Sequence, residues 1–152
     1  MATADDTQAK LQANKALVHS YFETAFNGHR PDRANEFLAP DVIWHSGTIG
    51  TVEGRDNVAA VVGAFIAALP DLQATEQAVV AEGDYVFVWG IIEGTHNGNF
   101  FGIPPTGRKL HFDAPDLYRI ADGKIAEEWA GDDGLAILAE LGVYTPPWMQ
   151  GA

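Results

Sequence analysis

The sequence predicts one domain of the α+β class, with helices first and a sheet of hairpin-connected strands after them. Two patterns predict it: apolar residues recur at helical spacing up to residue 70, and strand-like segments separated by turn signals follow from residue 72. The length of 152 residues suits one ordinary domain, and no repeat, linker or low-complexity tract divides the chain. We therefore expect a single domain over residues 1–152, with residues 1–10 as a flexible polar N-terminus.

The helical part begins with an amphipathic segment that ends at Gly28. One face of this segment comprises Leu11, Lys15, Val18, Tyr21, Phe22, Ala25 and Phe26. Pro31 suits the first turn of a second, shorter helix, which carries Phe37 and Leu38 and which Pro40 closes. The residues that follow, 42–45, are predicted to form a short strand.

A third helix is predicted to begin at an Asp56 N-cap and to end at Pro70. Its apolar face comprises Val58, Val61, Val62, Phe65, Ile66 and Leu69. The predicted strands of the second part are residues 72–81, 85–93, 109–120 and 124–131. Gly83-Asp84 and Asp122-Gly123 are turn signals between them. A last amphipathic helix over residues 135–141 is expected to end at Gly142.

The strand Tyr85-Val86-Phe87-Val88-Trp89 is apolar on both of its faces. An antiparallel sheet can leave one face in water, so an apolar pattern on both faces indicates that both are covered. Helices over a pocket would cover one face, and a second subunit would cover the other. We therefore expect a homodimer.

The composition excludes several classes of function. A formal charge of −12 works against binding to nucleic acids and to anionic membranes, because both require a basic surface. No apolar run is long enough to span a bilayer, and the N-terminus has no apolar signal-peptide segment. We therefore expect no nucleic-acid partner, no membrane partner and a cytoplasmic location.

The sequence also lacks the common motifs of cofactor and metal chemistry. It contains no cysteine, no glycine-rich phosphate-binding motif, no HExxH and no GxSxG. Its five histidines include no pair four residues apart. We therefore expect no cofactor and no metal, so that any chemistry would come from carboxylates, histidines and tyrosines in a pocket.

A succession of short motifs runs through the second half of the chain. In order they are Gly94-Thr95-His96-Asn97-Gly98, Gly102-Ile103-Pro104-Pro105-Thr106-Gly107, Asp116-Leu117-Tyr118-Arg119-Ile120, Asp122-Gly123-Lys124-Ile125, Glu127-Glu128-Trp129 and Leu141-Gly142. This succession resembles the SnoaL-like polyketide cyclase family, within the nuclear transport factor two-like superfamily, over residues 14–146.

The resemblance implies a cone-shaped, usually dimeric fold, in which a curved antiparallel sheet and N-terminal helices surround an apolar pocket. It also implies a ring closure by aldol condensation without a cofactor, using an acidic residue as acid/base. In this sequence the position of that aspartate is Ala130, while two pocket histidines of the family match Asp116 and Glu128, and a polar asparagine matches Trp44. The resemblance therefore implies the pocket but different groups inside it.

The residues around Asp122-Gly123 make a separate prediction about two carboxylates. A three-residue loop, Ala121-Asp122-Gly123, would pair Ile120 with Lys124, Tyr118 with Ala126, Asp116 with Glu128 and Ala114 with Ala130. Directly opposed residues share one face of a sheet. Asp116 and Glu128 would then share a proton and supply a general acid and a general base. The alternatives are that both are solvated, that Arg119 or Lys109 neutralises them, or that a one-residue slip separates them.

Other residues complete the predicted site. His45 is a third candidate catalytic residue, with a structural, hydrogen-bonded histidine as the alternative. Candidate substrate-binding residues are Trp44, Tyr118, Phe22, Trp89 and Phe101, for which the alternative is ordinary core packing. We expect His96 to hold the following loop and His111 to point away from the pocket. At the start of the last helix, Asp132 and Asp133 suit N-capping, with Asp132 near the pocket rim.

These observations predict a cofactor-independent acid/base enzyme that acts on an apolar aromatic or polyketide-like oxygenated small molecule. Aldol-type cyclisation, or a related proton transfer at carbon, is the leading interpretation. A retro-aldol carbon–carbon lyase or an isomerase acting on a phenolic compound is an alternative, because it would use the same acid and base. The alternative outside enzymes is a non-catalytic protein that binds a hydrophobic small molecule.

Overall fold

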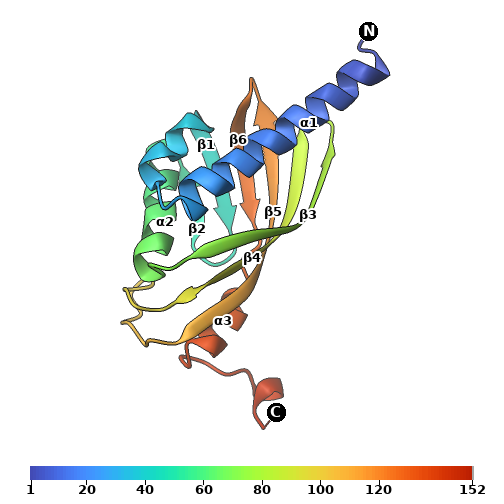
Figure 1. The fold of residues 1–152 in the computed structure, drawn as a ribbon. Helices are drawn as coiled ribbons and strands as arrows, with labels where there is room; N and C mark the ends of the chain where they lie inside the picture. The colour runs from blue at the N-terminus through green and yellow to red at the C-terminus, as the bar shows by residue number, and fades with distance from the viewer. Residues whose placement is uncertain (152) are drawn as a thin grey trace.

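The predicted succession of helices and strands forms one curved six-stranded sheet, with the N-terminal helices lying across its concave face (Figure 1). This is a computed structural model, and it describes residues 1–151. The elements are α1 (Ala4–Tyr21), η1 (Phe22–Asn27), η2 (Pro31–Glu36), β1 (Leu38–Ser46), β2 (Gly50–Glu53), α2 (Arg55–Ala68), β3 (Gln73–Glu82), β4 (Tyr85–Thr95), β5 (Lys109–Ala121), β6 (Lys124–Ala130), α3 (Gly134–Glu140) and η3 (Pro147–Met149). The predicted α+β class is confirmed. None of the described helices is long and apolar enough to cross a membrane.

The strand order is β2-β1-β6-β5-β4-β3, and the four strands from β3 to β6 follow the predicted ranges within two residues. The expectation of an antiparallel sheet is wrong at one place, because β1 pairs with β6 in the parallel direction. This pairing brings Trp44 of β1 beside Glu128 of β6, although the two residues are far apart in the sequence. The short strand β2, which the sequence analysis did not predict, pairs with the end of β1.

The first helix begins earlier than the expected flexible N-terminus allows. Thr3 caps α1 by accepting a hydrogen bond from the backbone of Asp6, whose carboxylate accepts one from the backbone of Thr3 in return. Residues 4–10 are therefore helical. At its other end α1 continues into a π-helical turn, η1, which brings Phe22 and Phe26 into a stacked pair at 5.6 Å. Gly28 ends this turn as predicted, and a Cβ at that position would lie 2.6 Å from the carbonyl oxygen of Thr24.

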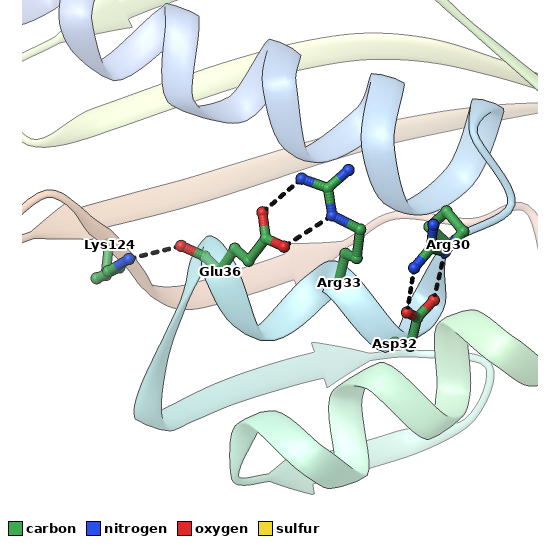
Figure 2. Close-up of polar contacts among 5 residues, drawn as sticks. All are labelled: Arg30, Asp32, Arg33, Glu36 and Lys124. Atoms are coloured by element: carbon green, nitrogen blue, oxygen red, sulfur yellow. Dashed lines mark hydrogen bonds and ion pairs between the residues drawn. The ribbon is translucent and has the colours of Figure 1, made fainter.

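The predicted second helix is a 3₁₀-helix, η2, and it ends at Glu36. The expectation that it carries Leu38 and closes at Pro40 is wrong, because Leu38 already begins β1, where it is fully buried and pairs with Ile125. Ion pairs hold the turn: Figure 2 shows Arg30 against Asp32 and Arg33 against Glu36. Lys124 donates to the carbonyl oxygen of Glu36, which joins η2 to the start of β6 (Figure 2). These ion pairs are exposed, so they orient the η2 turn but contribute little to the free energy of unfolding.

The third helix, α2, has the predicted apolar face but a different N-terminus. Val58, Val62 and Phe65 are buried, and α2 packs against β1 and η2. Asp56 is not the N-cap as expected; Gly54 takes that position with φ of 86°, and the Asp56 carboxylate accepts a hydrogen bond from Asn35 at 2.7 Å instead. The positive φ favours glycine there. The cap prediction failed because the chain turns at Gly54, two residues before Asp56.

The end of α2 positions the loop that follows β4. The backbone N–H groups of Asn97 and Gly98 both donate to the carbonyl oxygen of Ala68, at 3.2 and 3.0 Å. A Cβ at Gly98 would lie 2.0 Å from the carbonyl oxygen of Ala67, so only glycine allows this approach. The loop carries Phe100 and Phe101, which both contact the ring of Phe65 edge-on.

We predict that Gly98→Ala destabilises the protein by about 2 kcal/mol, because the added methyl group must displace backbone atoms at the end of α2. Thermal and urea unfolding would measure the change. Gly47→Ala is the matched control, since a Cβ at Gly47 has nothing within 4 Å. Equal stabilities of the two variants would contradict the close approach at Gly98.

Candidate active site

The register between β5 and β6 differs from the predicted one by two residues. Asp116 lies opposite Ala130, and Glu128 lies opposite Tyr118. The predicted three-residue loop is wrong because Asp122 and Gly123 both adopt positive φ, 50° and 70°, which form a two-residue turn that pairs Ala121 with Lys124. A shift between Arg119 and Ile120 then leaves one extra residue on β6.

This extra residue, Ala126, decides which face each carboxylate occupies. Ile120 pairs with Ile125, whereas Arg119 pairs with Glu127, so Ala126 has no partner across the ladder. Without such a bulge the two-residue turn would place Asp116 and Glu128 on opposite faces. With it, both side chains point to the concave face, as diagonal neighbours. The prediction of a shared face is confirmed, and the prediction of direct opposition is wrong.

Both carboxyl groups are buried on the concave face, with exposures of 6% for Asp116 and 5% for Glu128. Asp116 accepts hydrogen bonds from the backbone N–H of Gly131 at 3.1 Å and from the hydroxyl of Tyr118 at 3.3 Å. The Oε2 atom of Glu128 is buried with no hydrogen-bond partner among the described residues. This atom is free to form a hydrogen bond with a bound molecule.

The two cations considered as neutralising partners lie elsewhere. Arg119 has the opposite parity to Asp116 on β5, and its Nε donates to Glu127 at 3.2 Å on the convex face. Lys109 is exposed at the far end of β5. Neither of them neutralises the buried pair, and the pair is not solvated. Ionisation of one carboxyl group is therefore opposed by the charge of the other and by the apolar surroundings.

Burial and mutual repulsion make these groups retain protons. Burial raises the pKa of Asp116 well above its usual range, and the charges of Glu128 and Asp132 raise it further, against the opposing hydrogen bonds from Gly131 and Tyr118. Burial raises the pKa of Glu128 to about 8, although the side chains of Trp44 and Tyr118 favour its ionised form. Burial raises the pKa of Asp132 to about 6. At neutral pH the site therefore holds both protonated and ionised carboxyl groups.

The pair borders a small apolar chamber of about 30 Å³, roughly the volume of one water molecule. The chamber is lined by Phe22, Phe26, Trp44, Phe65, Ile92, Ala114, Asp116, Glu128, Ala130 and Asp132. Next to it lies an open groove of about 710 Å³ between the turn after β1, the loop after β4 and α3. Residues of the groove include Thr48, Ile49, Phe100, Phe101, Ile103, Asp132, Leu135 and Leu138. A small molecule would fit the groove, and only a single functional group would reach the chamber.

The structure brings some of the predicted substrate-binding residues together and separates others. Trp44 and Phe22 line the chamber, and Tyr118 is fully buried against the pair. Phe101 is half exposed at the groove, with φ of 45°. Trp89 lies on the convex face, 46% exposed, so its expected place in the pocket wall is wrong. Strand β4, which carries Trp89, is apolar on both faces, so periodicity alone does not show which face lines the pocket.

The histidines separate in the same way. His45 is on the convex face, where its Nε2 lies 2.8 Å from Glu127 and its ring stacks on Trp129, so it does not join the two carboxyl groups as expected. Trp44, its neighbour, points inward instead. His96 is fully buried and its Nδ1 lies 2.9 Å from the Thr106 hydroxyl, which holds the loop as predicted. His111 is exposed and away from the pocket, also as predicted.

Tyr21 and Phe26, which no sequence pattern singles out for the site, lie at it, and Asp132 lies near the pocket rim as predicted. Tyr21 is buried and lines a small cavity together with Glu128, and burial raises the pKa of its phenol, as do the charges of Glu128 and Asp116. Phe26 completes the aromatic cover of the chamber. Asp132 lines both the chamber and the groove. Asp133 caps α3 by accepting from the N–H of Ala136 at 2.9 Å, so one aspartate of this pair has the capping role and the other does not.

Metal ligands are not grouped in this part of the chain. Within residues 1–151, no three or more His, Asp or Glu side chains are arranged to hold a metal ion. The chemistry that the described residues offer at the site is proton transfer between carboxyl groups, phenols and a bound molecule.

Comparisons with known proteins agree with this fold and show the family. The family described as SnoaL-like polyketide cyclase matches residues 16–141. The chain is 31% identical to nogalonic acid methyl ester cyclase of Streptomyces nogalater, over 82% of this chain and 92% of that protein. It is 30% identical to aklanonic acid methyl ester cyclase DauD of a Streptomyces species, over 87% and 81% of the two chains. The crystal structure of IdmH from Streptomyces antibioticus superposes with a TM-score of 0.73 at 30% identity, covering 86% and 99%.

The raised pKa of Glu128 predicts a stability that falls with pH. Its pKa is 4.5 in the unfolded chain and about 8 in the folded protein, so the folded state binds the proton more tightly. This contribution is complete below about pH 4.5 and is lost as the pH rises through about 8. We expect the melting temperature to fall between about pH 5 and pH 8.5.

In Glu128→Gln, which cannot ionise, the slope should become shallower, with the raised pKa values of Asp116 and Asp132 accounting for what remains, and the variant should be more stable than the wild type at about pH 8.5. Circular dichroism melts over the pH range would measure both. Glu127→Gln is the control, because the pKa of Glu127 is lowered by His45 and Arg119 and its titration lies at acid pH. An unchanged slope in Glu128→Gln would show that Glu128 ionises normally.

Proposed function

The chain belongs to the SnoaL-like polyketide cyclase family, and we propose that it is a cyclase-type enzyme that closes a carbon ring by acid–base catalysis without a cofactor. The observation that carries this proposal is the buried Asp116–Glu128 pair beside the chamber. Burying two polar carboxyl groups costs free energy even when a proton is retained, so the fold maintains them at a cost. A protein that only binds an apolar molecule has no need of them.

The proposed reaction is an intramolecular aldol addition. A base removes a proton from the carbon next to one carbonyl group, and the electron pair of that C–H bond forms an enolate. The enolate carbon then bonds to a second carbonyl carbon, whose π electrons move to oxygen, and a protonated carboxyl group donates a proton to that oxygen. The product has the same atoms as the substrate, so no oxidant or reductant is needed. Protonated Glu128, with Asp116 beside it, suits the donor role at neutral pH.

The loss of the family's aspartate is compatible with this reaction. Ala130, which matches that position, lies directly opposite Asp116 across the ladder. Directly opposed side chains occupy neighbouring space on one face, and the small Ala130 leaves that space open. A carboxyl group therefore reaches the same part of the pocket from β5 instead of β6. This exchange supports a retained acid/base function with a different arrangement of groups.

The substrate class follows from the groove and from the relatives. Apart from one carboxylate, the residues of the groove are apolar or uncharged, and its volume of about 710 Å³ is that of a site for a multi-ring molecule. The curated relatives are named for nogalonic and aklanonic acid methyl esters. We take an aromatic polyketide ester as the substrate class. Reversal of the same steps would be a retro-aldol cleavage.

The purified protein should convert nogalonic acid methyl ester to a cyclised product of identical mass, detected by liquid chromatography and mass spectrometry. Gel filtration and EDTA treatment beforehand should leave the rate unchanged if no cofactor or metal takes part. A product of lower mass would instead indicate cleavage.

Replacing the carboxyl groups should separate catalysis from binding. We expect Asp116→Asn and Glu128→Gln each to lower kcat by about 10²-fold or more, with the dissociation constant of the ester nearly unchanged. Asp41→Asn, at an exposed site of β1, is the matched control. Full activity in both pocket variants would refute acid–base catalysis by the pair, and binding without turnover in the wild type would favour a binding protein.

We also propose the homodimer that the sequence analysis expects, with the convex face of the sheet as its interface. Large apolar side chains are exposed there: Val80 at 59%, Trp89 at 46%, Tyr85 at 43% and Phe87 at 37%. Val80, Phe87 and Leu117 are paired across three adjacent strands, so the exposed residues form one continuous face. Contiguous apolar surfaces of this kind are rare on monomers and typical of homodimers.

Phe87→Glu should convert the dimer to a monomer, because a buried unpaired charge at the centre of a two-fold interface is repeated on both subunits. Light scattering should give twice the chain mass of 16.4 kDa for the wild type and the single mass for the variant. Gln12→Glu, which adds the same charge on the exposed side of α1, should remain dimeric. A monomeric wild type at micromolar concentration would rule out the interface.

A further inference from the structure

Asp132 occupies the junction between the two cavities of the site. Among the described residues it alone lines both the groove of about 710 Å³ and the chamber of about 30 Å³. It is also the only charged residue that lines the groove within the described part of the chain. A molecule bound in the groove would therefore meet the Asp132 carboxylate before its functional group reached Asp116 and Glu128.

The local structure leaves this carboxylate available. Backbone contacts hold the residue in place: its carbonyl oxygen accepts from the N–H of Gly134 at 2.9 Å and from the hydroxyl of Thr48 at 3.4 Å. The capping of α3 falls to Asp133. The Asp132 side chain therefore has no capping role, although capping is the usual reason for an aspartate before a helix.

The chamber also has a polar atom that a ligand would satisfy. Glu128, only 5% exposed, lines the chamber, and its Oε2 atom has no hydrogen-bond partner within residues 1–151. Protonated Glu128 can donate to a carbonyl oxygen placed in the chamber. A substrate whose attacked carbonyl oxygen is in the chamber would place that carbonyl carbon at the junction, and the carbon that bonds to it and loses a proton would lie beside Asp132.

We propose that Asp132 is the general base of this enzyme, and that the Glu128–Asp116 pair is the general acid. The inference rests on the proposed function and assigns its two proton transfers to separate places in the pocket. Asp132 takes the proton from the carbon next to the substrate carbonyl, and the C–H electron pair forms the new carbon–carbon bond. Glu128 gives its proton to the oxygen of the carbonyl group that is attacked, so the numbers of protons and electrons are conserved.

The charges around Asp132 are consistent with this assignment. The titratable groups that face it are Glu128 on β6 and Asp116 on β5, whose pKa values its own charge raises. The described groove residues from the β1–β2 turn, the loop after β4 and α3 are uncharged. Burial raises the pKa of Asp132 to about 6 and that of Glu128 to about 8, so at pH 7 the base is ionised and the acid is protonated.

The test follows proton removal separately from ring closure. Nogalonic acid methyl ester would be incubated with the enzyme in D₂O, and exchange of the acidic C–H for deuterium would be followed by NMR beside formation of the cyclised product. We expect Asp132→Asn to lower both exchange and kcat/KM by about 10²-fold or more. Glu128→Gln should lower ring closure but keep exchange within about tenfold, because it removes only the acid.

Two further variants address folding. Asp133→Asn removes the same charge one residue along and keeps a good N-cap, so its activity should equal that of the wild type. Asp132→Glu retains a carboxylate, but a glutamate titrates about 0.5 pH units above an aspartate, so the acid limb of the kcat/KM profile should move upward from about pH 6, at a reduced rate. This variant tests the proposal even if Asp132→Asn is poorly folded, since a purely structural role would not move a pH profile.

The outcomes separate the two proposals. Exchange and turnover in Asp132→Asn within threefold of the wild type would overturn the inference and leave the proposed function standing. A wild type that neither exchanges nor cyclises the ester would overturn the proposed function, and the inference with it. Loss of exchange in Asp132→Asn alone, with Asp133→Asn active, would establish Asp132 as the base.

Discussion

Two carboxyl groups can be buried side by side without a cation only if at least one of them keeps its proton, and the concave face of this protein is organised around that constraint. Asp116 and Glu128 lie beneath aromatic rings of η1, β1 and α2, which exclude water from them. Charging both groups there would cost several kcal/mol, so the site retains protons at a pH where ordinary carboxylates have lost them. The fold therefore stores a proton donor in its core. The groove beside the chamber gives a substrate access to this proton donor.

The placement of the pair depends on a detail of the backbone. A sheet residue faces the side opposite to its neighbours, so the loss or gain of one residue in the β5–β6 pairing would move a carboxylate from the core to the convex face. With the two-residue Asp122-Gly123 turn alone, Asp116 and Glu128 would face opposite sides of the sheet. The unpaired Ala126 shifts β6 by one residue and returns both side chains to the same side. The cation Arg119 lies on the convex face for the same reason, paired with Glu127. The bulge therefore places Asp116 and Glu128 on the concave face and the Arg119–Glu127 ion pair on the convex face.

The pocket has two parts that different elements build. Strands supply the rigid floor of the chamber, while the β1–β2 turn, the loop after β4 and α3 supply the groove at the open end of the sheet. Loops at the end of a rigid scaffold can differ between relatives without disturbing the core. Gly98 ties one of these loops to the end of α2, so the groove is connected to the fold by a contact that only glycine permits. Two adjacent aspartates also have separate roles, one in the scaffold and one in the pocket. Asp133 caps α3, and Asp132 faces the cavities.

The sequence alone determined the order and type of the main elements and the family resemblance. It also predicted that Asp116 and Glu128 share a face, but through a three-residue loop, whereas the structure reaches that arrangement through a two-residue turn and the bulge at Ala126. Local periodicity carries this information, since alternation says which residues face the same way and turn residues say where a strand ends. The same alternation predicted correctly that the His111 side chain points away from the pocket. Only the tertiary structure decided that Trp44 and not His45 points inward, that Trp89 is outside, and that Asp132 reaches both cavities. Those outcomes depend on the parallel pairing of β1 with β6 and on the path of the chain after β6, which join residues far apart in the sequence and leave no periodic signal within it.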